Sequence, residues 1–207
     1  MSVTVRRRHR RQPEAIDGAE GNERLTALTG AVLLIGFAVE GLTIVSLHRL
    51  LTLHFFLGML LIGPVVLKIC STVYRFVRYY SGAGPYVRKG PPAPLLRLLG
   101  PFVIITSLAV LGTGVALAVV GPQQGHWLLL HKATFVLWFG VMTIHVLAYV
   151  WRLPRILLGG PDGRARIGAS GGRFRWLLVG TSLASGLLIA LLTIHLATPW
   201  IARTTGH

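Results

Sequence analysis

Two histidines share one face of a strongly apolar segment, "HKATFVLWFGVMTIH", in which His131 and His145 stand fourteen positions apart. In an α-helix, fourteen residues turn through about 1400°, within ~40° of four full turns, and rise by ~21 Å. Ionisable side chains inside an apolar helix are costly unless they are paired or ligated. The spacing therefore predicts a site with nitrogen ligands at two depths.

A second segment repeats this register. "HFFLGMLLIGPVVLK" begins at His54, and Lys68 stands fourteen positions later. When the two segments are superposed, His54 matches His131 and Lys68 matches His145. Two helices that run in the same direction would then present facing nitrogens at two levels. A six-coordinate haem iron requires one axial ligand from each side of its ring, and nitrogen is a common donor.

Small and aromatic residues near these positions could surround a flat ring. Gly58 lies four residues after His54 and removes a side chain where a ring edge would pass. Phe135 occupies the equivalent turn of the other segment. Trp138 lies seven residues from both histidines of its segment, so it projects between the two depths. It is either a packing side chain or an aromatic bridge between two redox centres.

Charged residues flank the site at both levels. Arg49 and Lys132 lie beside the outer pair and suit the carboxylates of a haem, although they could equally be ordinary interfacial charges. The same two interpretations apply on the inner side to Arg75, Arg78, Arg152 and Arg155. Three further histidines near outer helix ends are expected to be interfacial residues and not ligands: His48, His126 and His195.

The elements that must position these residues are membrane-spanning helices. The chain has 207 residues, of which 53% are hydrophobic and 13% charged, whereas soluble domains are about 25% charged. Crossing ~30 Å of hydrocarbon takes ~20 apolar residues, and only helices or closed barrels satisfy the backbone there. The runs are continuous and not alternating, which predicts an all-α polytopic fold with five transmembrane helices at roughly 25–47, 51–77, 95–120, 127–151 and 176–198.

The basic residues predict how these helices are oriented. A net charge of +15 could indicate nucleic-acid binding, but here the charge falls in blocks between apolar segments. Seventeen Lys and Arg residues lie in 1–24, 75–97 and 152–175, against three on the other side, namely Arg49, Lys132 and Arg203. The positive-inside rule then predicts a plasma-membrane protein with a cytoplasmic N-terminus and an outer C-terminus, and no nucleic-acid partner.

The arrangement of the histidines resembles that of the membrane cytochromes b, including those of quinol-oxidising complexes and ferric reductases. The resemblance covers residues 25–152 and implies a four-helix bundle with two stacked b-type haems that carry electrons across the bilayer. Three of the four expected histidines are present, namely His54, His131 and His145. The departure from the pattern is Lys68, which stands where the fourth histidine is expected.

Three interpretations of Lys68 remain open. It could ligate an inner haem opposite His145, which requires a neutral amine. The inner haem could instead be absent, so that one haem lies between His54 and His131 while Lys68 extends toward the inner headgroups. Finally, Lys68 and His145 could bind an anionic or quinone ligand. A structural His145, hydrogen-bonded to a neighbouring helix, is the simplest alternative.

Outside the bundle, the chain divides into three further parts. Residues 1–24 are expected to form a disordered basic cytoplasmic tail near anionic lipid, and 153–175 a cytoplasmic loop. Residues 176–207 are expected to form the fifth helix and a short outer tail. That helix could be a cover, a docking element or a homodimer contact. The single cysteine, Cys70, excludes an intrachain disulfide and any multi-cysteine metal site.

The sequence holds no nucleotide-binding motif, so electrons would have to come from a quinol or a separate redox partner. The direction of electron flow, the acceptor and any enzymatic oxidoreductase activity remain open. Two alternatives are a single-haem sensor or anchor subunit, and a proton or metal transporter lined by histidines and Glu40. Glu40 is the only acid within a span, and is either a proton relay or a packing residue.

Overall fold

The computed structural model describes residues 14–90, 94–152 and 172–205. These residues form helices and turns and contain no strand. Five helices are long and apolar enough to cross a membrane, which confirms the predicted all-α, multi-pass fold class. They are α1 (Glu14–Val45), α2 (Leu47–Tyr80), α4 (Pro94–Val120), α5 (Gly125–Tyr149) and α7 (Gly172–Thr193).

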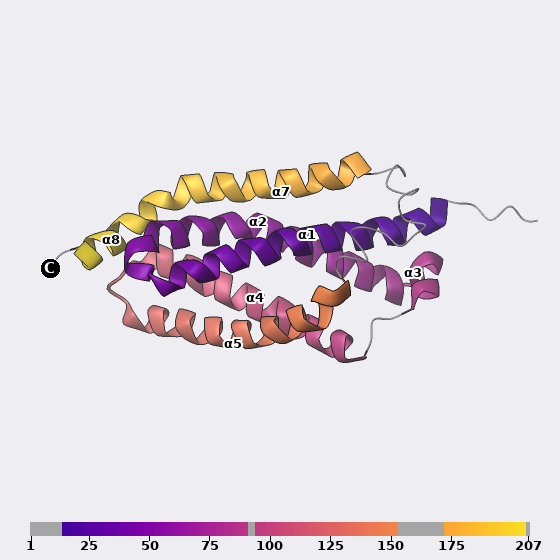
Figure 1. Cartoon of the computed structure of the whole chain (residues 1–207), viewed down its shortest axis with the longest axis horizontal. Coiled ribbons are helices and arrows are strands. Elements are labelled where there is room, and N and C mark those ends of the chain that lie inside the picture. The colour runs from indigo at the N-terminus through magenta and orange to yellow at the C-terminus, as the bar shows by residue number, and fades with distance from the viewer. Residues whose placement is uncertain (1–13, 91–93, 153–171, 206–207) are drawn as a thin grey trace, which may run out of the picture.

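Successive spans run in opposite directions along the long axis of the molecule (Figure 1). The connections from α1 to α2 and from α4 to α5 lie at one end, together with the short helix α8 (Thr198–Thr205). The other end holds the beginning of α1 and the six-residue helix α3 (Gly84–Lys89). Helices α2 and α5 therefore run in the same direction, as the repeated fourteen-residue register requires.

The side chains that face outward are largely apolar. Residues such as Leu129, Val136 and Leu188 have more than half of their surface exposed. Soluble monomers rarely expose contiguous apolar patches larger than a few hundred Å². This surface is suited to lipid contact, since hydrocarbon chains would cover it.

Helix α7 packs closely against α2, on the side of the α1–α2 pair opposite α5 (Figure 1). A methyl group on Gly186 would overlap the carbonyl oxygen of Leu60, and one on Gly63 would overlap the carbonyl oxygen of Ser182. The Leu60 carbonyl lacks its usual partner within α2 because Pro64, four residues later, has no N–H. Small residues thus let the two backbones meet at the point where the proline leaves a carbonyl unsatisfied.

The mid-depth region is filled by apolar side chains from three helices. Leu33, Leu61 and Val65 form a buried cluster, against which Phe37, Ile69 and Leu111 pack. In α2, Leu61 stands seven residues from both His54 and Lys68, so the cluster lies between the two levels.

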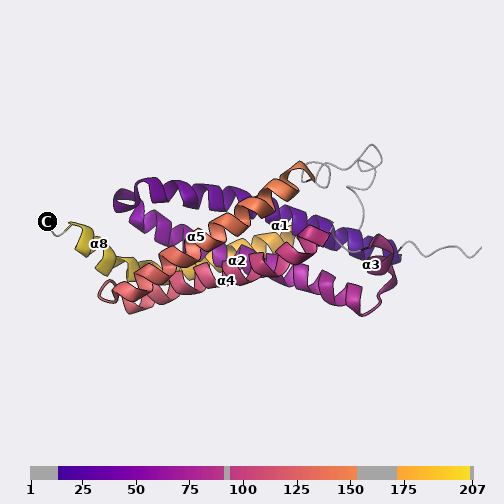
Figure 2. The same cartoon turned by 90° about the horizontal axis from the view of Figure 1, so that it is seen from below.

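Figure 2, turned by 90°, shows α5 running obliquely to the other spans.

Helix α1 begins earlier than the sequence suggests. The prediction of disorder up to residue 24 is wrong for residues 14–24, which form the first turns of α1. The side chain of Tyr86 in α3 helps to hold this extension, because its hydroxyl donates to the Gly18 carbonyl over 3.3 Å and the residue is buried. Residues 1–13 and most of the expected 153–175 loop lie outside the described residues.

Two short 3₁₀ segments follow the last spans. Val150–Arg152 follows α5, and Ile194–Ala197 joins α7 to α8. The expected fifth span and short tail thus correspond to α7, a 3₁₀ segment and α8. The close contact of α7 with α2 makes the fifth span part of the same packed unit as the expected four-helix bundle.

Candidate functional site

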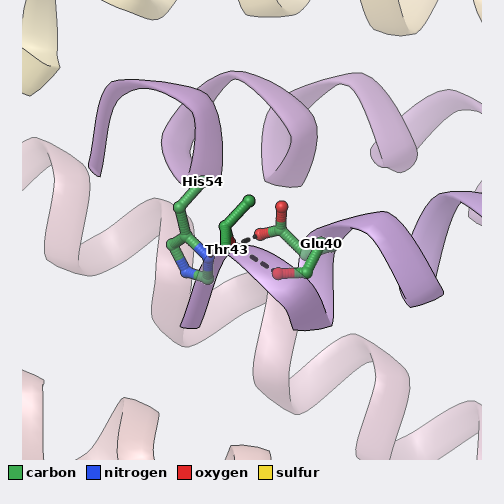
Figure 3. A network of polar contacts seen from close by, with 3 residues as sticks. All are labelled: Glu40, Thr43 and His54. Carbon is green, nitrogen blue, oxygen red and sulfur yellow. Dashed lines mark hydrogen bonds and ion pairs between the residues drawn. The ribbon is translucent and has the colours of Figure 1, made fainter. Parts of the chain in front are cut away.

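At the outer level, His54 of α2 is held by two side chains from α1 (Figure 3). Its Nδ1 lies 3.0 Å from Glu40 Oε1 and 2.9 Å from Thr43 Oγ1. The Thr43 hydroxyl donates to the Glu40 carbonyl over 2.5 Å, which leaves its oxygen as an acceptor for the ring. The Nδ1–H of His54 is therefore shared between the carboxylate and the hydroxyl, and Nε2 remains available for a further ligand.

Sequence reasoning treated Glu40 separately from the histidines and did not single out Thr43. Glu40 and Thr43 stand three positions apart and so share a face of α1. The short turn between α1 and α2 brings this face opposite the first turns of α2. A weak signal was present in the sequence, because Glu40 and His54 lie at similar distances from that turn.

Gly58 lies beside the same carboxylate. A Cβ at this position would be 3.5 Å from Glu40 Oε1, which is an ordinary van der Waals contact. The structure thus places Gly58 next to Glu40, on the α1 side of the outer level. Its predicted role beside a ring edge stays a prediction.

His131 of α5 is held in a similar way by α4. Its Nδ1 lies 3.2 Å from Thr113 Oγ1, and the Thr113 hydroxyl is also 2.8 Å from the Ala109 carbonyl. The side chain of Thr134 joins the same hydroxyl at 2.9 Å. Gly114 gives the imidazole room, since a Cβ there would be 3.1 Å from the His131 Cε1 atom.

The two imidazoles lie against different helices, His54 against Glu40 and Thr43 of α1, and His131 against Thr113 and Gly114 of α4. His54 lies close enough to His131 to influence it electrostatically, and both rings are partly buried. In each ring the side-chain hydrogen bonds use Nδ1, which leaves Nε2 without a side-chain partner among the described residues. The backbone of Val110 also interacts with the His131 ring. Two imidazole nitrogens from separate helices are a donor set of the kind that binds haem iron.

Trp138 lies in the layer between the outer and inner levels. It is buried, and its Nε1 donates to Ser107 Oγ on α4 over 3.1 Å. Its ring centroid is 4.8 Å from that of Phe37 on α1 and 6.2 Å from that of Phe135. The aromatic side chains expected near the site thus belong to the packed middle of the molecule, and an electron-bridging role for Trp138 stays a prediction.

At the inner level, Lys68 points toward α1. Its Nζ donates to the Thr26 carbonyl over 2.6 Å and occupies space left by Gly30, where a Cβ would be 2.9 Å away. Thr26 and Asn22 also bond to Ser71, one turn after the lysine, over 3.1 Å in both cases. Lys68 is therefore part of a polar contact between α1 and α2.

His145 is not hydrogen-bonded to this lysine. Its ring centroid lies 4.8 Å from that of Tyr149, one turn later in α5. Lys68 is nevertheless near enough to act on it electrostatically. The structure thus brings these two residues to the same level without joining them directly.

The flanking charged residues lie on the surface of the molecule. Arg49 and Lys132 are exposed, and neither forms a side-chain hydrogen bond or ion pair with the part of the chain that the structure describes. On the inner side Arg78 is also exposed and Arg75 is half-buried, while Arg155 lies outside the described residues. The remaining outer histidines are exposed, as expected for interfacial residues: His48, His126 and His195.

Among the described residues, no group of three or more His, Cys, Asp or Glu side chains is placed to hold a bare metal ion. The outer level offers two imidazoles, His54 on α2 and His131 on α5, each held by a side chain of the preceding helix. Comparison with protein-family models, curated protein sequences and solved structures found no match for this chain. Its functional assignment therefore depends on the geometry of its own residues.

Proposed function

We propose that this protein is a membrane b-type cytochrome that holds a haem between His54 and His131. The observation that carries the proposal is that the two imidazoles have the same hydrogen-bonding arrangement. In each, Nδ1 is engaged by a side chain of the neighbouring helix, and Nε2 is left for a ligand. When bound, a haem supplies one-electron chemistry, while the protein contributes ligands, orientation and an apolar environment.

The residues around the two histidines determine what such a haem would do. Glu40 and Thr43 fix the tautomer and orientation of His54, and Thr113 does the same for His131. Two protein ligands would fill both axial positions of the iron. This favours electron transfer over the binding of an external molecule at the metal.

The direction of the spans agrees with transfer across the bilayer. With a cytoplasmic N-terminus, the His54 and His131 level would lie near the outer face. Electrons would come from a quinol or a separate redox protein, because the sequence contains no nucleotide-binding motif. Reduction of the purified protein by a quinol analogue tests the quinol as donor.

The inner level supports two versions of the proposal. A second haem between Lys68 and His145 would require Lys68 to leave the Thr26 carbonyl, to which it now donates over 2.6 Å. That hydrogen bond favours the version with a single haem, in which Lys68 closes the contact between α1 and α2. A single haem is also compatible with a sensor or an anchor subunit.

The first test is the haem content of the purified full-length protein in detergent. We expect a red protein with a reduced-minus-oxidised spectrum typical of haem b, and loss of at least tenfold in haem occupancy in His54→Ala and His131→Ala. His126→Ala is the matched control because this histidine is exposed at the beginning of α5. A colourless wild-type protein would overturn the proposal, and metal-dependent flux in vesicles without haem would favour a transporter.

The stoichiometry of Lys68→Ala separates the two versions. If the protein holds one haem, the ratio of haem to protein stays near one in this variant. If Lys68 ligates a second haem, the ratio falls from two to one. In either case, His145→Ala should have the same ratio of haem to protein as Lys68→Ala.

A further inference from the structure

We infer that Glu40 is a positioning residue for the outer haem, and that it makes His54 the stronger electron donor of the two axial ligands. The inference rests on the proposed function, since it concerns how this chain would tune that haem. It assigns a role to Glu40, the one acidic residue within the expected span 25–47, whose function the sequence left open.

The first support is an asymmetry between the two histidines. Glu40 Oε1 lies 3.0 Å from His54 Nδ1, whereas the side chain on His131 Nδ1 is the uncharged hydroxyl of Thr113. Both contacts come from the helix that precedes the histidine's own helix. Only the contact to His54 includes a carboxylate.

The second support is the surroundings of the carboxylate. The Glu40 side chain is 15% exposed, and its Oε2 is buried without a hydrogen-bond partner among the described residues. No Lys or Arg side chain in the part of the chain that the structure describes forms an ion pair with it. The interaction with His54 is therefore the main compensation for placing this acid inside the bundle.

The physical consequence follows from the chemistry of metal-bound imidazole. A carboxylate that accepts the Nδ1–H fixes the ring and raises the basicity of Nε2. A more basic ligand stabilises oxidised iron relative to reduced iron, and so does the nearby negative charge. A neutral hydroxyl does less, because hydrogen bonds with an ionised partner are roughly twice as strong. Glu40 should therefore hold the midpoint potential of the outer haem low.

The test is a potentiometric titration of the purified full-length protein. Glu40→Gln keeps the size of the side chain and its capacity to accept a hydrogen bond, but removes the charge. We expect this variant to retain haem and to have a higher midpoint potential than the wild type. Glu40→Asp keeps a carboxylate and should give a smaller upward shift. Thr113→Val, which removes the neutral partner of His131, is the matched control and should shift the potential less than Glu40→Gln.

The outcomes distinguish this inference from the proposal on which it rests. A wild-type protein without haem overturns the proposed function. A haem-containing wild type whose potential equals that of Glu40→Gln overturns the role of Glu40 alone. Should Glu40→Gln lose its haem, Glu40→Asp decides the question, because a raised potential supports the inference and an unchanged one overturns it.

Discussion

At the scale of single residues, three ionisable groups inside the bundle each contact a specific polar partner. Glu40 contacts His54, Lys68 donates to a backbone carbonyl of α1, and His131 bonds to a threonine of α4. Burying a neutral polar group away from water costs about 2–7 kcal/mol unless a hydrogen-bond partner in the protein replaces the water. The partners thus decide which atoms stay available to a ligand.

The glycine beside His131 offers a sharp test at this scale. Gly114→Val should push the imidazole from its place against α4 and lower haem occupancy, with an overpacking penalty of about 1–3 kcal/mol. Gly112→Val is the matched control, since it lies in the same helix and a Cβ there meets nothing within 4 Å. Equal haem content and melting temperature in the two variants would contradict the placement of His131.

At the scale of helices, the contact between α2 and α7 depends on small residues and one proline. Gly63 and Gly186 let the two backbones approach, and the carbonyl that Pro64 leaves without a partner lies at the crossing. Packing of this kind is what holds helices together in lipid, where apolar side chains gain little by leaving the hydrocarbon. The fifth span therefore stabilises the helix that carries His54 and Lys68.

Replacing one of these glycines should weaken the packing of α7 against α2. In Gly186→Leu the new side chain cannot be accommodated against the Leu60 carbonyl. We expect a loss of about 1–3 kcal/mol in stability and a lower melting temperature in detergent. Gly180→Leu in the same helix is the control, because a Cβ there meets nothing within 4 Å. A melting temperature in Gly186→Leu equal to that of the control would argue against this crossing.

At the scale of the whole molecule, basic residues gather at one end of the bundle. The described part of that end includes Arg24, Arg75, Arg88 and Arg97, whereas the other end has Arg49, Lys132 and Arg203. The positive-inside rule assigns the more basic end to the cytoplasm. On this prediction, we expect the level of His54 and His131 to lie nearer the outer face.

Labelling of engineered cysteines tests this orientation in a background that carries Cys70→Ala. We expect Arg203→Cys to react with a membrane-impermeant maleimide in intact cells, because α8 lies at the end of the bundle that the positive-inside rule predicts to be outside. Arg88→Cys in α3 should react only after the cells are opened. The reverse pattern of labelling would show that the topology is inverted.

The sequence by itself determined the fold class, the number of spans and the register of the two parallel segments. Continuous apolar runs permit little except helices in lipid, because every backbone N–H and C=O must be satisfied within the chain. A fourteen-residue spacing also fixes which side chains share a face, since helix geometry is nearly invariant. Basic residues between the runs predict the orientation on similarly general grounds.

Only the tertiary structure decided which partners these side chains meet. Glu40 contacts His54 because the rotation and tilt of α1 against α2 bring the two residues together, and no local pattern specifies that rotation. The long side chain of Lys68 could reach either α1 or α5. The missing side chain at Gly30 leaves room for its Nζ to bond to the Thr26 carbonyl of α1. The position of α7 likewise depends on backbone contacts between residues far apart in the sequence. Such contacts depend on packing between helices, whereas hydropathy and spacing record only what each helix does by itself.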